Sequence, residues 1–474
     1  MHIEFDGEGK SNYTRAVLSE REPKSLRTFT PSQAVISKSA GVFHWTPEGR
    51  RLYDFSSGVL VANLGHNPRR WLQRFCTYLN WDASLFDEPG EEYFPAIGLT
   101  AYNAMTELEA AATQRLCSAL QNTPGGKNLE QVMWAASGSE AVQKALWACL
   151  DRDPQRNMII ATRYGFHGKK GLAGAVTGSE NDHERDPRVK FISFPMLECD
   201  DLVAPSAEFN PATYQRELDR LWSDLGERIG CLITEPYLGG GGSYHPPQGY
   251  FQILQRWCRQ HDVLLILDEV QSNFGRTGTM FAFEKYGIEP DFVCLGKGLG
   301  NGVPVSAAVG RRDVMNHMHY GEASDTWSAN PMSCAAVLAT LDEFESSDVL
   351  ENTARLNTVF DEKLLALKES PAIARVRGEG LVYGIESAAI GDSSAAEVAN
   401  EIVLECYLGE LDGDGIHLLG ALAGKVLRVS PPMTMTLDQA VEALNLLSRI
   451  VDRTAEKLQA MTSAADSTNL EMMS

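Results

Sequence analysis

Long apolar runs and clustered basic residues are both scarce in this sequence. The longest tight apolar run is Val263 to Leu267, which is far too short to span a bilayer. Lysine and arginine number 42 against 63 acidic residues, for a formal net charge of -21, and they form no basic block. We therefore expect no membrane-spanning segment, and neither nucleic acid nor an anionic membrane as a partner.

Cysteine pairs and a leader-like start are also missing. The nine cysteines lie scattered from Cys76 to Cys406, without a C-x-x-C pair and without metal-like Cys/His spacing. This pattern predicts neither a disulfide framework nor a metal site. The segment from Met1 to Arg15 is acidic and polar, where a signal peptide would be basic and then apolar. These features favour a cytoplasmic protein with reduced thiols.

The composition is otherwise that of a large globular protein. The chain has 474 residues, 43% hydrophobic and 22% charged, and this length favours two domains or one large domain carrying a smaller one. From about residue 132 to 310, strand-like runs alternate with helical ones, which predicts an α/β fold with a mostly parallel sheet flanked by helices. The later pattern predicts a smaller α+β domain. We expect an N-terminal segment of the small domain at 1–65, a large domain at 66–330 and a C-terminal small domain at 331–474.

Individual elements are predicted from hydrophobic periodicity. The expected strands are Asn157 to Ala161, Lys190 to Phe194, Cys231 to Thr234, Val263 to Leu267, Phe292 to Leu295 and Leu381 to Glu386. The expected helices are at 106–120, 141–150, 249–260, 334–344, 353–367 and 395–405, with a last helix from about Leu437. A hairpin is expected at 41–55, an irregular excursion at 81–105, and fraying from about Ala460.

Three short segments carry candidate chemistry. Ser137-Gly138-Ser139 opens a helix whose free N–H groups favour a phosphate, although serine is also a common N-cap. Asp268 ends a strand at the edge where ligands bind in such sheets, although it can also cap a loop or helix. Lys297 lies between glycines just past another strand, where burial can lower its pKa enough for a nucleophile or base.

The glycines around Lys297 allow one other interpretation, a dinucleotide turn from Gly296 to Gly302. The pattern G-x-G-x-G differs from G-x-G-x-x-G, however, and Val-Pro-Val follows where a helix should begin. A nucleotide-dependent oxidoreductase is therefore a poor alternative.

Two longer motifs make the chain recognisable. Leu267-Asp-Glu-Val-Gln-Ser-Asn-Phe-Gly-Arg-Thr-Gly278 and Gly296-Lys-Gly-Leu-Gly300 resemble the signature of the class III aminotransferases, which are fold type I pyridoxal 5'-phosphate enzymes. Ordered matches over most of the chain add to the resemblance: Asp54-Phe-Ser-Ser-Gly58, Asn63-Leu-Gly-His66, Ser137-Gly-Ser-Glu-Ala141, Gly165-Phe-His-Gly168, Glu235-Pro236, Thr326-Trp-Ser-Ala-Asn-Pro331, Arg377-Gly-Glu-Gly-Leu381 and Leu427-Arg-Val-Ser-Pro-Pro432.

The resemblance implies how the cofactor is held. Lys297 forms the covalent imine with pyridoxal 5'-phosphate and moves the proton between the substrate carbon and the cofactor, while Asp268 pairs with the pyridine nitrogen. Gln271 approaches the ring hydroxyl and Phe166 stacks on the ring face. The remaining cofactor contacts are assigned to Gly138 and Ser139 at the phosphate and to His167, which can instead be a structural neighbour of Phe166.

Other matches concern the substrate and a second chain. Arg428 resembles the arginine that binds the substrate's α-carboxylate, with a surface salt bridge as the alternative. Glu235 is expected to shape the substrate pocket, with a purely structural carboxylate as the alternative. Thr326 matches a residue that reaches the phosphate of a neighbouring subunit, which implies a homodimer with shared active sites.

Two positions depart from the family pattern. Lys169 stands where relatives that use glutamate have arginine, and lysine can attract a carboxylate but lacks the planar fork, so a diamine donor is also compatible. Gly240 replaces a glutamate that, in relatives, pairs with the equivalent of Arg428 while an ω-amino donor is bound. Without it, Arg428 can accept a carboxylate in both half-reactions.

The expected activity is ping-pong transfer of an amino group from an amine or amino acid to a 2-oxo acid, pyruvate or 2-oxoglutarate. Aminomutases, racemases and decarboxylases of the same family remain alternatives because they share the site. A catalytically silent dimeric scaffold is a distant alternative, which the presence of Lys297 and Asp268 disfavours.

Overall fold

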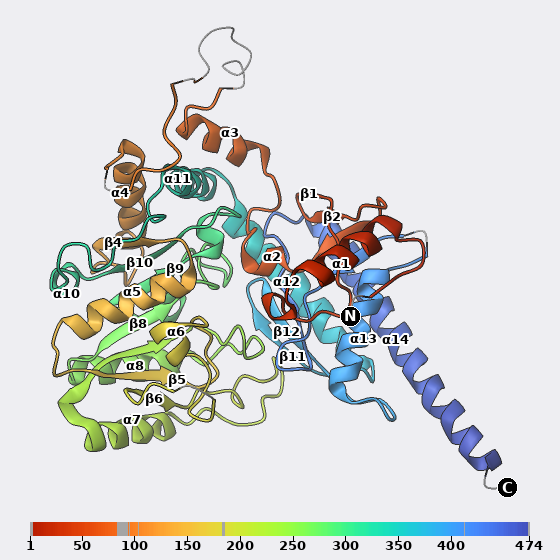
Figure 1. The fold of residues 1–474 in the computed structure, drawn as a ribbon. Helices are drawn as coiled ribbons and strands as arrows, with labels where there is room; N and C mark the ends of the chain where they lie inside the picture. The colour runs from red at the N-terminus through yellow and green to blue at the C-terminus, as the bar shows by residue number, and fades with distance from the viewer. Residues whose placement is uncertain are drawn as a thin grey trace.

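A seven-stranded sheet forms the centre of the larger lobe of the protein, seen in Figure 1. This computed structural model describes residues 3–82, 93, 95–102, 104–182, 185–411 and 413–472, with side chains up to residue 463. The strand order is β4-β10-β9-β8-β7-β5-β6; β10 runs antiparallel to β4 and β9, and the pairs from β9 to β6 are parallel. The strands are β4 (Gln131–Ala135), β5 (Met158–Thr162), β6 (Val189–Ile192), β7 (Ile229–Thr234), β8 (Leu264–Asp268), β9 (Phe292–Leu295) and β10 (Ser306–Gly310).

Helices cover both faces of this sheet. Successive side chains of a strand point to opposite faces, so Ile159 packs in one hydrophobic cluster and Ile160 in the other. One face carries α5 (Gly138–Asp151), α6 (Gly171–Ala175) and α10 (Arg312–Met315). The other carries α4 (Glu107–Gln121), α7 (Pro211–Leu225), α8 (Gln248–Gln260), α9 (Ala282–Tyr286) and α11 (Pro331–Ser346), with α3 (Arg69–Tyr78) packed on α11.

Two smaller sheets build the rest of the molecule. An antiparallel sheet joins β11 (Ile373–Glu379), β12 (Val382–Ser387) and β14 (Val426–Val429). The other has the order β1-β2-β3-β13 and brings β1 (Lys38–Ala40), β2 (Phe43–Trp45) and β3 (Arg51–Asp54) beside the distant β13 (Gly415–His417). The N-terminal and C-terminal parts of the chain therefore share one sheet.

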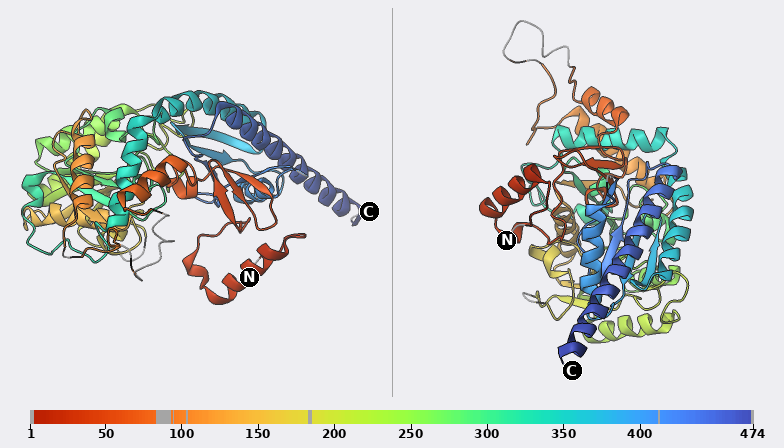
Figure 2. Two further views of the ribbon diagram at one scale, coloured as in Figure 1. Left: turned by 90° about the horizontal axis from the view of Figure 1, so that it is seen from above. Right: turned by 90° about the vertical axis from the view of Figure 1, so that its right-hand side faces the viewer.

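The remaining helices surround these smaller sheets. They are α1 (Gly9–Arg21), the short turn α2 (Ser57–Leu60), α12 (Val349–Ala366), α13 (Ala395–Leu408) and α14 (Leu437–Met472). Figure 2 shows α14 reaching outward to the C-terminus and α1 lying apart from the larger lobe. No helix of the described residues combines the length and apolar character that a membrane span requires.

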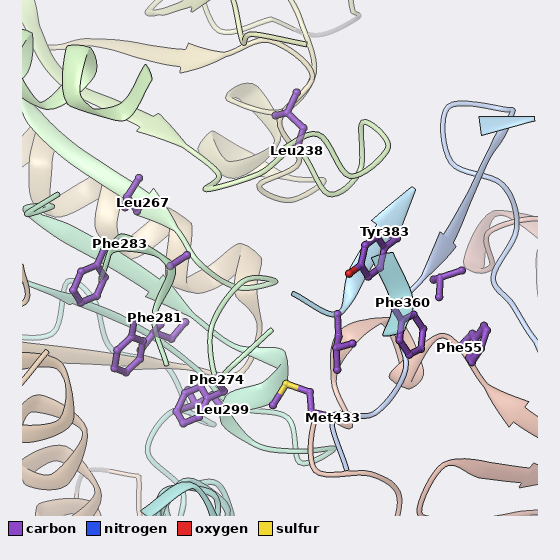
Figure 3. Packing of buried hydrophobic residues seen from close by; sticks show 14 of the residues in the cluster. Phe55, Leu238, Leu267, Phe274, Phe281, Phe283, Leu299, Phe360, Tyr383 and Met433 are labelled. Atoms are coloured by element: carbon purple, nitrogen blue, oxygen red, sulfur yellow. The ribbon is translucent and has the colours of Figure 1, made fainter. Parts of the chain in front are cut away.

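Aromatic residues fill the core on both sides of the junction between the lobes. Phe274 and Phe281 meet edge to face with ring centroids 5.9 Å apart, while Phe360 stacks on Tyr383 at 6.0 Å. Figure 3 shows Met433 between these two groups. One buried cluster contains all five residues, so apolar packing is continuous across the junction.

The predicted α/β architecture is confirmed, with differences in detail. All five predicted strands of the large sheet are present, displaced by up to two residues, but its strands β4 and β10 were not predicted. Outside it, β11, β13 and β14 were also missed, as were the helices α1, α3 and α7. α14 continues as a helix past Ala460 to Met472, and fraying of this end stays a prediction. Of the predicted irregular excursion at 81–105, residues 83–92, 94 and 103 lie outside the described residues. The domain boundaries after residues 65 and 330 stay a prediction.

Candidate active site

A cavity of about 370 Å³ opens where several strands of the large sheet end. Loops that follow parallel strands meet at the same edge of a sheet, which places distant parts of the sequence around one space. The wall contains eight of the predicted site residues: Gly138, Ser139, Phe166, His167, Glu235, Asp268, Gln271 and Lys297.

The start of α5 leaves two backbone donors free. Ser137 Oγ accepts from the N–H of Glu140, whose carboxylate in turn accepts from Ala136 and Ser137, so the capping box uses those donors. No hydrogen bond of the described residues uses the N–H of Gly138 or Ser139. A Cβ at position 138 would lie 2.9 Å from Val270, so glycine is needed for this close approach. The cap and the anion-binding prediction are therefore compatible at one helix end.

Lys297 is the buried amine of the cavity. Its φ is +47°, a left-handed conformation that is unfavourable for a residue with a Cβ and is found mainly at functional sites. Burial lowers the pKa of Lys297 to about 8; Asp268 and Glu235 oppose this shift, and the charge of Arg428 adds to it. About a tenth of the amine is therefore neutral and nucleophilic at pH 7, far more than for an unburied lysine.

Asp268 faces the cavity from the end of β8 and is oriented by His167. His167 Nδ1 lies 2.7 Å from Asp268 Oδ2, and Asp268 Oδ1 accepts from the N–H of Val270. Burial opposes charge on His167, but its hydrogen bond with Asp268 and the carboxylate charge prevail and raise the pKa of His167. The hydrogen bond between them fixes the orientation of the Asp268 carboxylate at the base of the cavity.

Glu235 and Gln271 occupy the same wall in different ways. The carboxylate of Glu235 accepts from the N–H groups of Phe166 and Gly239, and it thereby joins two loops. Burial raises the pKa of Glu235 to about 7. Gln271 Oε1, in contrast, is buried with no hydrogen-bond partner, so it is an acceptor available to a ligand.

Two arginines lie buried beside this site. Arg428 of β14 is outside the cavity wall, and its Nε is buried without a hydrogen-bond partner. Arg276 is completely buried and bonds only neutral oxygens: those of Leu381, Pro431, Ser57 and Asn63. Neither guanidinium takes part in any ion pair found among the described residues. Burial lowers the pKa of Arg276 to about 10. The negative charge of a bound carboxylate would stabilise the two buried guanidinium groups.

Arg276 was missed as a functional residue by the sequence analysis. It lies inside the recognised motif Leu267 to Gly278, but its partners are far away in the sequence. Only the fold places those partners together.

Besides Arg428, two further predicted site residues lie outside the cavity wall of their own chain. Lys169 is exposed and outside the wall. Thr326 is also exposed, on a loop held to α5 by an ion pair of 2.6 Å between Lys144 and Asp325. Thr326 therefore does not contact the cavity of its own chain.

The groups that face the cavity match a flat, phosphate-bearing pyridine. Two free N–H groups suit the phosphate, Asp268 suits a protonated ring nitrogen, and the unpartnered Gln271 oxygen suits a ring hydroxyl. The Phe166 ring is 41% exposed at this cavity and can lie against a planar ligand. The residues present therefore fit pyridoxal 5'-phosphate.

Comparison with known proteins gives an independent result. The family model described as Aminotransferase class-III matches residues 94–451. The 4-aminobutyrate aminotransferase of Mycobacterium leprae is 28% identical over 444 residues, covering 92% of this chain and 94% of that protein. The acetylornithine aminotransferase of Oceanobacillus iheyensis is 28% identical over 434 residues, covering 90% and 95%.

A solved structure shares the fold. The ornithine aminotransferase of Toxoplasma gondii superposes with a TM-score of 0.77 at 22% identity, covering 96% of this chain and 97% of that one.

Proposed function

The chain belongs to the class-III aminotransferases, which use pyridoxal 5'-phosphate to transfer amino groups between an amine or amino acid and a 2-oxo acid. We propose that the residues of the cavity described above perform this reaction. The observation that carries the proposal is the buried, conformationally strained Lys297 beside Asp268 in one cavity. When bound, the cofactor supplies an electrophilic aldehyde and an electron-withdrawing ring.

The residues of the wall hold and orient the cofactor. The N–H groups of Gly138 and Ser139 bind the phosphate, and Gln271 approaches the ring hydroxyl. Asp268, steered by His167, keeps the ring nitrogen protonated, which increases electron withdrawal from the reacting carbon. Phe166 packs against the ring, in a position that Glu235 stabilises through the Phe166 N–H.

Lys297 does the proton chemistry. Its amine would hold the bound cofactor covalently, and the same amine, when released, would take the proton from the substrate carbon and return it during transfer. The lowered pKa of Lys297 supports this role because a base must be unprotonated to accept a proton.

Arg428 binds the carboxylate of the 2-oxo acid, for which pyruvate and 2-oxoglutarate are the proposed compounds. Position 240 is glycine, and no ion pair of the described residues involves Arg428, so the guanidinium is free in both half-reactions. We therefore expect α-amino acid donors to be accepted alongside amines. Lys169 is exposed, so we propose for it only a long-range attraction of carboxylates.

We further propose a cytoplasmic homodimer with shared active sites. The exposed position of Thr326 and the 66% exposed Trp327 beside it support an interface at this loop. The nine free cysteines support a reducing compartment.

The visible absorption spectrum tests this function. The purified protein should show a cofactor band that borohydride fixes covalently only in the presence of Lys297, so the Lys297→Ala variant should lose fixation. One class among amino acids, ω-amino acids and diamines should bleach the band, and a 2-oxo acid should restore it. A band that no amine changes, or carbon dioxide release in place of a new keto acid, would contradict amino-group transfer.

The role of Arg428 needs a separate comparison. Arg428→Lys should raise the KM for the 2-oxo acid by about 10- to 100-fold, because lysine lacks the bidentate fork, and should affect a donor without a carboxylate much less. Arg449→Lys, at an exposed ion pair with Glu410, is the matched control and should change neither KM. Equal slowing of both half-reactions would contradict carboxylate binding by Arg428.

A further inference from the structure

A second cluster of polar groups lies outside the cavity, in the sheet that joins the two ends of the chain. His44 of β2, Asp54 of β3 and His66 of the following loop bring one ligand-type atom each to within 4.8 Å of one another. Asp54 Oδ2 lies 3.4 Å from His44 Nε2 and 2.7 Å from His66 Nε2. Asp54 and His44 are buried, and the His66 side chain is 17% exposed.

The outer sides of these groups are held by the surrounding structure. Ser39 Oγ lies 2.7 Å from His44 Nδ1, which directs the other ring nitrogen of His44 toward Asp54. Asp54 Oδ1 accepts from the N–H groups of Ser56 and Ser57 and from Ser56 Oγ, so only Oδ2 faces the two histidines. Such outer hydrogen bonds orient ligands in metal sites.

A fourth group points to a missing ligand. His417 of β13 lies against His44, with ring centroids 5.3 Å apart, and its Nδ1 is buried without a hydrogen-bond partner. A buried polar atom without a partner is unfavourable unless something binds it. The partial exposure of His66 leaves a route by which a small ion can enter.

We propose that His44, Asp54 and His66 bind a divalent ion of the zinc class, beside the unpartnered His417. Imidazole nitrogens with one carboxylate oxygen are a ligand set that zinc accepts, whereas Mg²⁺ and Ca²⁺ prefer oxygen alone. Bonds of about 2.1 Å in a tetrahedron separate ligand atoms by about 3.4 Å, the spacing of His44 from Asp54. His66 must retreat by roughly 0.7 Å to reach the same spacing.

The ion links segments that are distant in the sequence. It joins β2 and β3 of the N-terminal hairpin to the segment that holds His66, next to β13, which pairs in parallel with β3. The opposite oxygen of Asp54 supports Ser56 and Ser57, at the start of a left-handed turn with positive φ at Ser57, Gly58, Val59 and Leu60. This turn leads into Val61, which lines the cavity. The bound ion therefore stabilises the turn that leads to one wall of the active-site cavity.

Metal content and zinc titration of the full-length, cofactor-loaded protein, with any affinity tag removed, test the proposal. We expect one equivalent of tightly bound Zn²⁺ per chain. Stripping with a chelator should lower the melting temperature by about 3 °C, and zinc should restore it. His66→Gln should weaken zinc binding about 100-fold and abolish the zinc-dependent shift. The exposed His317→Ala is the matched control and should change neither result.

A proton shared between the histidines and Asp54 is the competing explanation, and it predicts no metal. Absence of stoichiometric zinc binding, or equal zinc affinity in His66→Gln, would overturn the proposal. If His66→Gln does not fold, X-ray absorption at the zinc edge of the wild-type protein decides. Imidazole and oxygen ligands support the site, and a sulfur shell or a purely oxygen shell overturns it.

Discussion

At the scale of single residues, the ionisable side chains in and beside the cavity have shifted pKa values because they are buried away from water. Lys297 and Arg428 have lowered pKa values chiefly because they are buried, and Glu235 has a raised one for the same reason. Each of these groups is thereby less stable in its charged form, and a ligand of opposite charge or a change of proton stabilises it. Lys297 and Glu235 can therefore exchange protons near neutral pH, and Arg428 can bind an anionic ligand.

The pKa of Lys297 makes a prediction for cofactor attachment. Only the neutral amine attacks an aldehyde, so the rate at which the apoenzyme takes up pyridoxal 5'-phosphate should rise about tenfold per pH unit below pH 8. It should level off above pH 8, because the amine is then already deprotonated. Stopped-flow absorbance from pH 6 to about 10 measures this rate, with Lys297→Ala as the blank. A rate that keeps rising to pH 10 would mean an unperturbed lysine.

At the scale of elements, one arginine ties the active-site loops to the smaller lobe. Arg276 follows β8 and donates to the carbonyl groups of Leu381 and Pro431, before β12 and after β14. It also donates to the side chains of Ser57 and Asn63, which flank the left-handed turn. The planar guanidinium can serve several acceptors at once, which an ammonium on a flexible stem cannot do.

Arg276→Lys keeps the positive charge, but it should still lower the free energy of unfolding because lysine cannot replace all of the hydrogen bonds of the guanidinium. At least two charge-assisted hydrogen bonds are lost and their buried acceptors stay unpaired, so we expect a loss of about 3 kcal/mol. Urea unfolding followed by fluorescence measures the change in midpoint. Arg355→Lys, at an exposed ion pair with Asp348, is the control and should shift the midpoint little. Equal midpoints for both variants would show that Arg276 is not a tie between elements.

At the scale of the whole molecule, the described chain forms the cavity but leaves one predicted contact outside it. Thr326 is exposed on a loop anchored through Lys144, and the aromatic side chains of Tyr320 and Trp327 on the same segment are exposed as well. An exposed aromatic pair beside a candidate phosphate ligand is best explained by a second copy of the chain.

Mixing two impaired variants, at a cofactor concentration too low to fill the Thr326→Ala sites, tests this arrangement. Thr326→Ala should lower cofactor affinity about tenfold by removing one phosphate contact, and Lys297→Ala should abolish turnover. Unfolding and refolding the two together should restore about a quarter of wild-type activity, because half of the dimers are mixed and each then has one intact site. Recovery no greater than that of Thr326→Ala alone would mean that Thr326 does not serve the partner's site.

Residue patterns alone were enough to predict the family, the α/β architecture and the residues expected at the centre of the site. Lys297, Asp268 and Ser137 to Ser139 could be identified because each lies in a short local pattern, at the end of a strand or the start of a helix, where spacing alone indicates the chemistry. Which distant groups meet, however, depends on how the chain packs in three dimensions and could not be predicted from the sequence. The sharing of one sheet by the N-terminal hairpin and β13, the neutral partners of Arg276 and the gathering of His44, Asp54 and His66 depend on packing between segments, and no local spacing records it.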